Sequence, residues 1–567
     1  MEVKELYAAW KANATEDDSL MVELQEIAGK DEEIFDRFYR ELEFGTAGLR
    51  GVIGAGTNRM NIYTVRKATQ GLAEYIKEVG GTSAAIAYDS RIKSDLFARE
   101  AARVLAANGI TVYIYKELMP TPMLSYAVRE LNCTAGIVVT ASHNPAKYNG
   151  YKAYGADGCQ LSVENSAKVL EYVDKVEMFG GAKLTDFDQA LADGQIQYIE
   201  QELIDRYLNA VASQSIEPVT TDLKVIYTPL NGTGNKPVRK ILEMIGVKNV
   251  TVVPQQEYPD GNFPTAPYPN PEIRQAFECA LKLAEQEPAD LLLATDPDAD
   301  RVGIAVKDGD GYTLMSGNEV GALLLNYILS RRAANGTLPR QPMAVKTIVS
   351  TQLAAKIAEK HGCQMVDVLT GFKYIGEQVG LLEAKGEENR FVFGFEESYG
   401  YNASSFVRDK DAVIASMLIC EMAAYYKSVN KSLLEVLNDL YKEHGIFCCS
   451  QNSFTFEGAA GMETMKNIMA TLRQNPPKAI NGHPVTAVLD FGVSVETNTA
   501  TGEQTPITLP KSDVLYYRMG NAGDNVIVRP SGTEPKIKIY ITAIEDTEEK
   551  AKAKSDGWLK ELSAQFK

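Results

Sequence analysis

Short apolar runs alternate with segments of helical periodicity along most of this 567-residue chain. Runs of about four to eight apolar residues between turn residues predict strands, whereas apolar residues three or four positions apart predict helices. Strands are predicted at 84–88, 110–116, 135–139, 223–227, 291–294, 344–349, 365–369 and 391–393. Helices are predicted at 94–107 (with Ser94 as its cap), 123–131, 237–245, 272–285 and 411–426, and one more ends at 361. This alternation predicts three successive α/β domains with mixed, mostly parallel sheets, resembling a degenerate triplication.

The two ends of the chain have different patterns. Residues 1–44 are charged and helical, and four apolar residues at helical spacing predict a face that packs on the rest of the protein. These residues are Phe35, Phe38, Tyr39 and Leu42. After about residue 445, alternating segments at 485–489, 514–517 and 536–542 precede a helix at 547–565, which predicts a smaller C-terminal α+β domain. The expected segments are therefore 1–44, 45–210, 211–320, 321–445 and 446–567.

The strand at 135–139 ends in a polar loop, Thr140-Ala141-Ser142-His143-Asn144-Pro145. Pro145 prevents direct continuation of the strand, and the loop is expected at the carboxyl edge of a sheet, where open α/β folds bind ligands. A serine hydroxyl beside a histidine and lysines could carry a phosphoryl group there. Taken alone, such a Ser-His pair is more often an ordinary strand-to-loop turn.

The strand at 291–294 ends in a second polar loop, Thr295-Asp296-Pro297-Asp298-Ala299-Asp300-Arg301. Three alternating aspartates can converge on one hard cation. An EF-hand would need glycine at loop position six and glutamate at position twelve, where this chain has Arg301 and Lys307. Oxygen-only ligands without nearby His or Cys favour Mg²⁺, and the alternative is a solvated acidic turn.

Three further loops contain glycine and polar residues. A glycine-rich stretch at 44–51 contains Arg50, which could bind phosphate in a bidentate manner, and Arg529-Pro530-Ser531-Gly532-Thr533-Glu534-Pro535-Lys536 has the composition of a phosphate nest. The pair Gly232 and Gly234 hints at a dinucleotide fingerprint, but Pro237 occupies the position of the third glycine, so a nicotinamide cofactor is rejected.

The composition narrows the range of partners. The net charge of −17 gives no global attraction to nucleic acid or to an anionic membrane. Seven cysteines without metal-ligand spacing predict reduced thiols in the cytoplasm, and the N-terminus lacks the pattern of a secretion signal. No apolar run approaches the roughly 20 residues of a membrane span.

The motifs TASHNP, TDPDADRVG, GFEESYG and RPSGTEPK, in this order and at these distances, resemble the α-D-phosphohexomutase superfamily. The resemblance covers the chain from about residue 40 onward. EFGTAGLRG followed by TNRMNIYTVRKATQG is similar to the branch that contains phosphoglucomutases, phosphopentomutases and sugar-bisphosphate synthases. The resemblance implies four domains around a central cleft, a mobile fourth domain, and a phosphorylated sugar as substrate, bound by a monomer or homodimer.

The resemblance also implies a role for each matching residue. Ser142 would carry the transferable phosphoryl group, and Asp296, Asp298 and Asp300, with Ser142, would bind Mg²⁺ beside Arg301. Glu396 and Ser398 would contact the sugar hydroxyls. The non-reacting phosphate would lie in the loop of Arg529, Ser531, Gly532 and Thr533. Groups around the phosphoserine and substrate would be Arg50, His143, Lys152, Thr370, Gly371 and Lys373.

One departure concerns the proton-transfer group. Some relatives have a histidine after the Glu-x-Ser motif, but this chain has Tyr399-Gly400-Tyr401. Arg408-Asp409-Lys410-Asp411 resembles the lysine motif of other relatives, so Lys410 is the candidate general base, with a pKa lowered by neighbouring cations. The alternative is a surface charge cluster that opens a helix.

The implied activity is transfer of a phosphoryl group between the 1- and 6-positions of glucose, with glucose 1,6-bisphosphate as intermediate and activator. Mannose and pentose phosphates remain alternative substrates, because Glu396 and Ser398 do not by themselves identify the sugar. A Ser-dependent sugar phosphatase is the alternative from another class. A non-catalytic sensor would need neither the nucleophile nor the aspartates.

Overall fold

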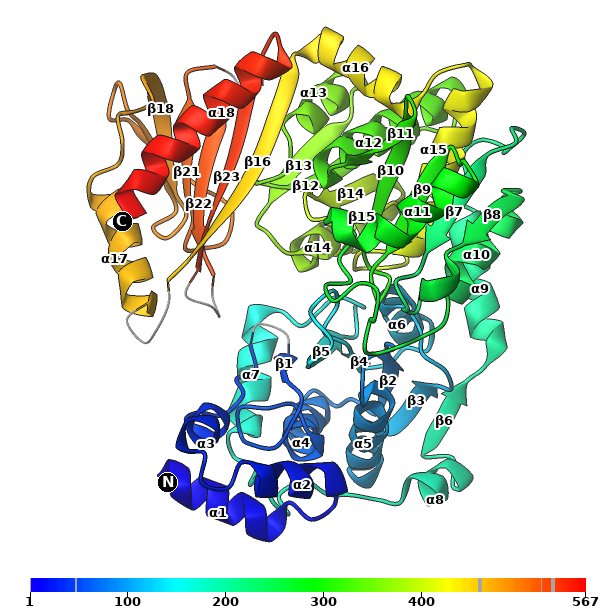
Figure 1. The fold of residues 1–567 in the computed structure, drawn as a ribbon, viewed down its shortest axis with the longest axis vertical. Coiled ribbons are helices and arrows are strands. Elements are labelled where there is room, and N and C mark those ends of the chain that lie inside the picture. The colour runs from blue at the N-terminus through cyan, green and yellow to red at the C-terminus, as the bar shows by residue number, and fades with distance from the viewer. Residues whose placement is uncertain (1, 46–47, 457–460, 522, 532–535, 567) are drawn as a thin grey trace. The chain divides into compact units, whose positions relative to one another are not determined.

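The computed structural model describes residues 2–45, 48–456, 461–521, 523–531 and 536–566 (Figure 1). By proximity of its Cα atoms the chain forms two compact units. Unit 1 comprises Met1–Gly317 and Phe372–Asn430, and unit 2 comprises Asn318–Gly371 and Lys431–Lys567. The chain therefore enters unit 2, returns to unit 1 and finishes in unit 2.

Three helices precede the first sheet, as the helical pattern of residues 1–44 predicts. They are α1 (Val3–Asn13), α2 (Asp18–Glu26) and α3 (Asp31–Phe38). Trp10 of α1 is buried, and its ring lies edge-on to Phe38 of α3 with centroids 5.9 Å apart. These helices thus share an apolar core with the first sheet of unit 1.

The apolar face expected on the third helix is partly wrong. α3 buries Ile34 and Phe38, but Phe35 and Tyr39 are 58% and 44% exposed and stack on each other at the surface. A step of one residue turns a side chain by about 100° around the helix, so these two rings point away from the core. Leu42 packs against the core but lies beyond the end of the helix.

A six-stranded sheet forms the first α/β region of unit 1. Its strands are β1 (Gly48–Val52), β2 (Ser83–Tyr88), β3 (Thr111–Tyr115), β4 (Ala135–Val139), β5 (Tyr148–Gly155) and β6 (Ile196–Ile199). The strand order is β1-β5-β4-β2-β3-β6. Strands β4, β2, β3 and β6 pair in parallel, whereas β5 is antiparallel to β4 and β1. The helices of this region are α4 (Ile62–Glu78), α5 (Ser94–Ala107), α6 (Thr121–Glu130), α7 (Val163–Val173), α8 (Phe187–Ala192) and α9 (Gln201–Ala212).

Ser94 does not cap α5 as expected. It is the first helical residue, and Lys93, with a left-handed φ of 63°, precedes it. The Ser94 hydroxyl donates instead to Asp89 Oδ1 at 2.7 Å, because Asp89 is buried beneath the helix start and needs donors.

The second sheet of unit 1 has five strands. They are β7 (Lys224–Thr228), β8 (Asn249–Val252), β9 (Leu291–Thr295), β10 (Val302–Asp308) and β11 (Gly311–Met315). Their order is β11-β10-β9-β7-β8, with β9-β7-β8 parallel and the other pairs antiparallel. Its helices are α10 (Asn235–Met244), the 3₁₀ turns η1 (Pro254–Gln256) and η2 (Arg274–Phe277), and α11 (Glu278–Gln286).

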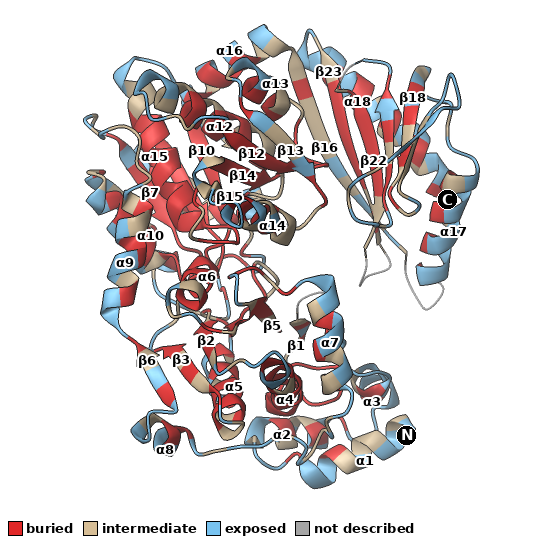
Figure 2. Cartoon of the chain, turned by 180° about the vertical axis from the view of Figure 1, so that it is seen from behind, coloured by how far each residue is buried: buried red, intermediate tan, exposed pale blue. Residues whose placement is uncertain are grey.

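The remaining part of unit 1 contains one antiparallel strand pair and two helices. The elements are α14 (Phe372–Glu383), the 3₁₀ turn η3 (Glu388–Arg390), β14 (Phe391–Glu396), β15 (Gly400–Asn402) and α15 (Ala412–Ser428). Helix α15 is buried on all sides from Ala412 through Ala424 (Figure 2). Its N-terminus therefore has to be satisfied by protein groups rather than by water.

Unit 2 combines an α/β part with an antiparallel sheet. The first part contains α12 (Gly317–Ala334, whose first residue belongs to unit 1), β12 (Met343–Thr347), α13 (Leu353–Lys360), β13 (Gln364–Val368) and α16 (Leu433–His444), with β12 parallel to β13. The sheet contains β16 (Ile446–Thr455), β17 (Ala479–Ile480), β18 (His483–Asp490), β19 (Val495–Asn498), β20 (Gln504–Pro506), β21 (Leu515–Met519), β22 (Asn525–Pro530) and β23 (Lys536–Glu545). Its order is β16-β23-β22-β21-β18-β19-β20, and β17 pairs with β18. The helices α17 (Gly461–Gln474) and α18 (Glu548–Ser563) and the turn η4 (Ala564–Phe566) complete it. The α+β pattern predicted after residue 445 is confirmed.

Among the described residues, no single helix has both the length and the apolar composition of a membrane span. Only α15 and α16 taken together meet that test, and only by length and composition.

Asp411 satisfies the buried start of α15. Its Oδ1 accepts from the N–H groups of Val413 and Ile414 at 2.9 and 3.1 Å, and the Tyr207 hydroxyl donates to both carboxylate oxygens at 2.9 Å. Burial raises the pKa of Asp411 to about 6, although these hydrogen bonds oppose the rise. The cap therefore titrates within the range of ordinary buffers.

We expect Asp411→Ala to lower the free energy of unfolding by about 1–3 kcal/mol, because it leaves buried donors without an acceptor, and Asp411→Asn to cost less. Since the pKa in the folded state is raised, the protonated carboxyl stabilises the fold below about pH 4, and this contribution is lost as the pH rises through about 6. Urea midpoints measured between pH 5 and 7 should fall more in the wild type than in Asp411→Asn. Parallel pH profiles would contradict the assignment.

Candidate active site

Ser142 lies in a strained turn directly after β4. Its φ of 51° is left-handed, and the residue is 4% exposed. The Ser142 N–H donates to Thr140 Oγ1 at 2.8 Å, which tightens the turn. The hydroxyl donates to Asp296 Oδ2 at 2.9 Å, and His143 Nδ1 lies 3.1 Å from the same Oγ. The predicted nucleophile and the predicted metal loop therefore meet within unit 1.

The antiparallel pairing of β4 and β5 brings Lys152 back to the serine loop. Lys152 lies opposite Val138 of β4 and opposite Gly48 of β1. The sequence of residues 148–155 does not predict a strand, because polar residues such as Asn149 interrupt the apolar pattern. In the structure Asn149 is buried and donates to the Ile92 carbonyl at 3.0 Å. Arg50 lies two residues after Gly48 on β1, opposite Gly150 of β5, and is exposed.

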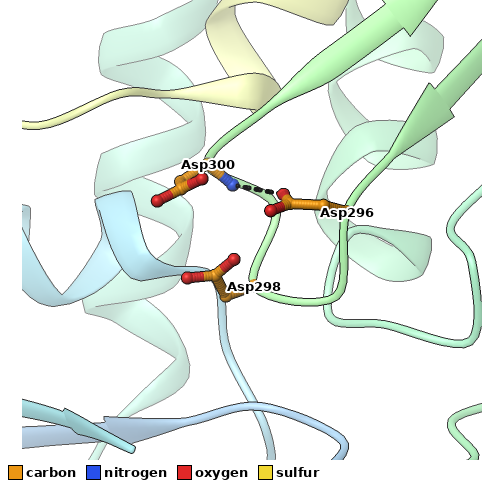
Figure 3. Close-up of side chains that lie close together, drawn as sticks. All are labelled: Asp296, Asp298 and Asp300. Atoms are coloured by element: carbon orange, nitrogen blue, oxygen red, sulfur yellow. Dashed lines mark hydrogen bonds between the residues drawn. The ribbon is translucent and has the colours of Figure 1, made fainter. Parts of the chain in front are cut away.

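Asp296, Asp298 and Asp300 lie close together on the loop between β9 and β10 (Figure 3). All three are buried, and one ligand atom of each lies within 4.8 Å of the others. Asp296 Oδ1 accepts from the N–H groups of Asp300 and Arg301 at 3.2 and 3.0 Å, so the loop curls around its own first carboxylate. Ala299, with φ of 47°, supplies the turn.

One lysine bridges the second and third aspartates, and another lysine contacts the third. Lys152 Nζ lies 2.8 Å from Asp298 Oδ2 and 3.5 Å from Asp300 Oδ2, and Lys410 Nζ lies 3.2 Å from Asp300 Oδ2. Thr121 Oγ1 also donates to Asp298 Oδ2, at 2.9 Å. Burial acts to raise the pKa of Asp298, but Lys152 outweighs it and holds the pKa well below the usual range. Burial and the negative charge of Asp298 raise the pKa of Asp296.

The donor set fits a hard divalent cation. Asp298 Oδ1 and Asp300 Oδ1 are buried and have no hydrogen-bond partner in the described structure. An orphaned buried carboxylate oxygen is costly unless a cation completes it. All candidate ligands are oxygens, which is the set that Mg²⁺ prefers.

The electrostatic environment predicted for Lys410 is wrong. Carboxylates rather than cations contact its ammonium: Asp300 Oδ2 lies at 3.2 Å and Asp409 Oδ1 at 3.0 Å. Burial acts to lower the pKa of Lys410, but these carboxylates raise it above its ordinary value. A lysine in this environment stays protonated. The lowered pKa that was expected to make Lys410 a general base is therefore not found.

His143 has the opposite environment. Burial first, and then the charges of Arg301 and Arg50, place the pKa of His143 well below its usual value. The imidazole is therefore neutral at ordinary pH. Arg301 itself is held by Glu272, with NH1 2.8 Å from Oε1, and by the Ser398 carbonyl at 2.9 Å.

The predicted sugar-binding loop follows β14 in unit 1. Glu396 is the buried last residue of β14, and the Ser398 carbonyl accepts from Arg301, so this loop is tied directly to the metal loop. Tyr399 turns the chain with a left-handed φ of 66°. Lys373 lies in the first turn of α14, and burial lowers its pKa.

The predicted phosphate loop belongs to unit 2. Arg529 of β22 donates from NH1 to the hydroxyl of Thr370, which directly precedes Gly371. The Ser531 N–H donates to the Lys536 carbonyl at 2.7 Å, which closes the base of the loop. Gly532 and Thr533 lie outside the described residues.

Several residues that support the site are not predicted by the sequence. Tyr154 and Gln160 donate to Asp409 Oδ2 at 2.6 and 3.1 Å and so fix the partner of Lys410. Thr121 contacts Asp298 from the start of α6. These residues lie far from their partners in sequence, and no local spacing marks them.

Comparisons with known proteins assign the chain to a family. Residues 41–179, 205–309 and 316–444 match the descriptions Phosphoglucomutase/phosphomannomutase, alpha/beta/alpha domain I, domain II and domain III. A phosphoglucomutase of Staphylococcus epidermidis is 39% identical over 508 residues, which are 88% of this chain and 90% of the relative.

Solved structures share the fold at lower identity. The open form of pp63/parafusin (phosphoglucomutase) from Paramecium is 17% identical with a TM-score of 0.69, covering 93% of this chain and 96% of its own. The N-acetylphosphoglucosamine mutase of Aspergillus fumigatus, solved with GlcNAc-6P and magnesium, is 13% identical with a TM-score of 0.51, covering 93% and 97%. Three domain matches and a relative of 39% identity place this chain in the phosphoglucomutase/phosphomannomutase family.

Proposed function

We propose that this chain is a phosphoglucomutase that interconverts α-D-glucose 1-phosphate and glucose 6-phosphate. The observation that carries the proposal is the Ser142 hydroxyl, which lies 2.9 Å from Asp296 at the edge of a buried triad of aspartates. The sequence identity to phosphoglucomutases over most of both chains favours glucose among the sugars of the family.

In the proposed cycle, Ser142 carries a phosphoryl group and donates it to the free 6-hydroxyl of glucose 1-phosphate. The P–O bond to Ser142 Oγ breaks, a P–O bond to the sugar oxygen forms, and one proton moves from the sugar hydroxyl to the serine side. The product is glucose 1,6-bisphosphate. After it turns over, its 1-phosphate returns to Ser142 and leaves glucose 6-phosphate. Added glucose 1,6-bisphosphate therefore acts as an activator.

Nearby side chains would offset the charge of the phosphoserine. A phosphoserine carries about −1.5 to −2 charges near neutral pH. The ammonium groups of Lys152 and Lys410 both contact Asp300. Arg50 lies on β1, which pairs with β5, the strand that carries Lys152. Neutral His143 beside Ser142 Oγ can accept or donate a hydrogen bond without adding charge.

Asp296, Asp298 and Asp300 would hold Mg²⁺, with a phosphoryl oxygen on Ser142 completing the ligand set. When bound, the ion supplies Lewis-acid stabilisation of the charge on the transferring phosphoryl group. The chain itself orients the three carboxylates through the backbone of Asp300, the hydroxyl of Thr121 and the ammonium of Lys152. The related mutase from Aspergillus fumigatus was solved with magnesium.

Glu396 and Ser398 are proposed to contact the sugar hydroxyls, together with Lys373. The distal phosphate would bind to Thr370, Gly371, Arg529, Ser531, Gly532 and Thr533. The hydrogen bond between Arg529 and Thr370 supports a common role for these two side chains. The proposed setting is the cytoplasm, with the enzyme as a monomer or homodimer.

Replacing the nucleophile tests the chemistry. Ser142→Ala should lose essentially all mutase turnover, a loss of about 10⁴-fold or more, because no residue remains to carry the phosphoryl group. Incubation with glucose 1,6-bisphosphate and Mg²⁺ should add one phosphate to the wild type and none to the variant, as measured by intact mass. Ser416→Ala is the control, since this serine is fully buried in α15 and its hydroxyl has no hydrogen-bond partner in the described structure. Full turnover by Ser142→Ala would refute the phosphoserine mechanism.

Removing the metal ligands tests the cation site. Chelation should abolish activity and Mg²⁺ should restore it, and Asp298→Asn should weaken divalent-cation binding by about 10-fold or more, because it removes a charged ligand. Binding can be measured directly with Mn²⁺ by electron paramagnetic resonance. The matched control is Asp308→Asn, because Asp308 is exposed at the end of β10 and the change also removes one carboxylate. Equal Mn²⁺ affinity in wild type and Asp298→Asn would place the ion elsewhere.

A comparison of sugars tests the substrate assignment. Glucose 1-phosphate should give the highest kcat/KM when glucose, mannose and ribose 1-phosphates are assayed side by side. Glu396→Gln should lower kcat/KM for the preferred sugar by about 10- to 100-fold, since a charged hydrogen bond to a sugar hydroxyl contributes about 1.5–3 kcal/mol. A preference for mannose or ribose 1-phosphate would identify a phosphomannomutase or phosphopentomutase, and steady release of inorganic phosphate would identify a phosphatase.

A further inference from the structure

Arg91 binds the backbone of the loop that presents Ser142. Its NH1 donates to the carbonyls of Pro145 and Tyr148, both at 3.0 Å. Its NH2 donates to the carbonyls of Ser142 and Asn144. One guanidinium thus joins four carbonyls between residues 142 and 148, a geometry that the planar fork of arginine provides and a lysine ammonium does not.

The Arg91 side chain is enclosed on every side. It is fully buried, and its Nε lies 3.3 Å from Asp89 Oδ2, whose side chain is also fully buried. The ring of Phe263, from the loop after η1, lies 5.1 Å from the guanidinium carbon. Gly261 of the same loop packs so closely that a Cβ there would stand 2.5 Å from the Ile92 nitrogen. The guanidinium is therefore held in one place by both α/β regions of unit 1.

Two further contacts involve Asp89 and Thr140. Asp89 Oδ1 accepts from the Arg91 N–H at 2.9 Å and so holds the backbone of Arg91. Thr140 Oγ1 accepts the Ser142 N–H at 2.8 Å. The carbonyl and the amide of Ser142 are thus both held, one by Arg91 and the other by Thr140.

The contacts of Arg91 and Thr140 with the serine loop form a clamp. This clamp is needed because Ser142 has a left-handed φ of 51°. This conformation is unfavourable for a residue with a Cβ and persists only when the surroundings impose it. A released loop would relax and withdraw the hydroxyl from Asp296.

We propose that Arg91, held by Asp89 and acting on the loop carbonyls, and Thr140, acting on the Ser142 N–H, are positioning residues that hold Ser142 in line for phosphoryl transfer. The inference rests on the proposed function, in which Ser142 is the phosphoryl carrier. Arg91 donates to backbone carbonyls of the loop, so its role concerns the rate of transfer rather than the affinity for the sugar.

The test compares Arg91→Met and Arg91→Lys with Arg66→Met. Arg66 is a buried arginine of the same unit, paired with Glu100 and Glu16 and remote from the serine loop in its contacts. Arg91→Met should lower kcat, and the rate at which glucose 1,6-bisphosphate phosphorylates Ser142, by about 100-fold, because small misplacements of a reacting group have effects of this size. KM for glucose 1-phosphate should stay within about threefold. Arg91→Lys should recover only part of the rate, and Arg66→Met should lower Tm but leave kcat within about threefold.

A milder pair covers the case in which Arg91→Met does not fold. Thr140→Val removes the acceptor of the Ser142 N–H with almost no change in volume and should slow phosphorylation of Ser142 by about 10-fold, the effect of one lost hydrogen bond. Thr140→Ser keeps the hydroxyl and should restore the rate. If Thr140→Val and the Arg91 variants that fold keep kcat within about threefold of the wild type, as is expected for Arg66→Met, the proposal is overturned.

Hydrogen–deuterium exchange separates this inference from the proposed function. Exchange across residues 140–148 should accelerate in Arg91→Met and Thr140→Val but not in Arg66→Met, whether or not the sugar is glucose. Unchanged exchange in that loop would overturn the clamp. Failure of the wild type to take up phosphate from glucose 1,6-bisphosphate, with faster exchange in the variants, would refute the proposed function alone.

Discussion

The constraint on which this site depends is the mutual repulsion of three carboxylates buried together after β9. Desolvation and like charge both oppose ionisation of such a group, so the surrounding protein has to supply compensation. Lys152 and Lys410 supply positive charge at Asp298 and Asp300, and backbone N–H groups serve Asp296. Asp298 Oδ1 and Asp300 Oδ1 accept no hydrogen bond in the described structure, and they are the oxygens that a bound cation would complete.

The loops that build the site share a second physical feature. Ser142, Ala299 and Tyr399 each have a left-handed backbone although none is glycine, and each lies in a loop between two strands of unit 1. Strain of this kind persists where surrounding contacts impose it, and it is common at functional sites. For Ser142 these contacts are the carbonyl bonds of Arg91 and the hydroxyl of Thr140. Buried side chains of the sheet regions therefore fix the position of the Ser142 hydroxyl.

The sequence was most informative where chemistry is local. The triad and the serine loop could be recognised because their residues are contiguous and follow apolar strands, and their proximity in unit 1 is confirmed. Supporting residues such as Tyr154 and Thr121 could not be predicted, because their partners lie more than 100 residues away. The environment of Lys410 was predicted wrongly partly for the same reason. Besides its neighbour Asp409 at 3.0 Å, the ammonium contacts Asp300 at 3.2 Å, and no local pattern connects Asp300 to it.

The central claim is that the aspartate triad and Ser142 form one site for a metal ion and a phosphoryl group. Anomalous diffraction from crystals of the phosphorylated chain grown with Mn²⁺ tests this directly. The account predicts a single strong peak within about 2.0–2.4 Å of oxygens from Asp296, Asp298 and Asp300 and of one phosphoserine oxygen. A peak remote from these aspartates, or a phosphate on a residue other than Ser142, would contradict it.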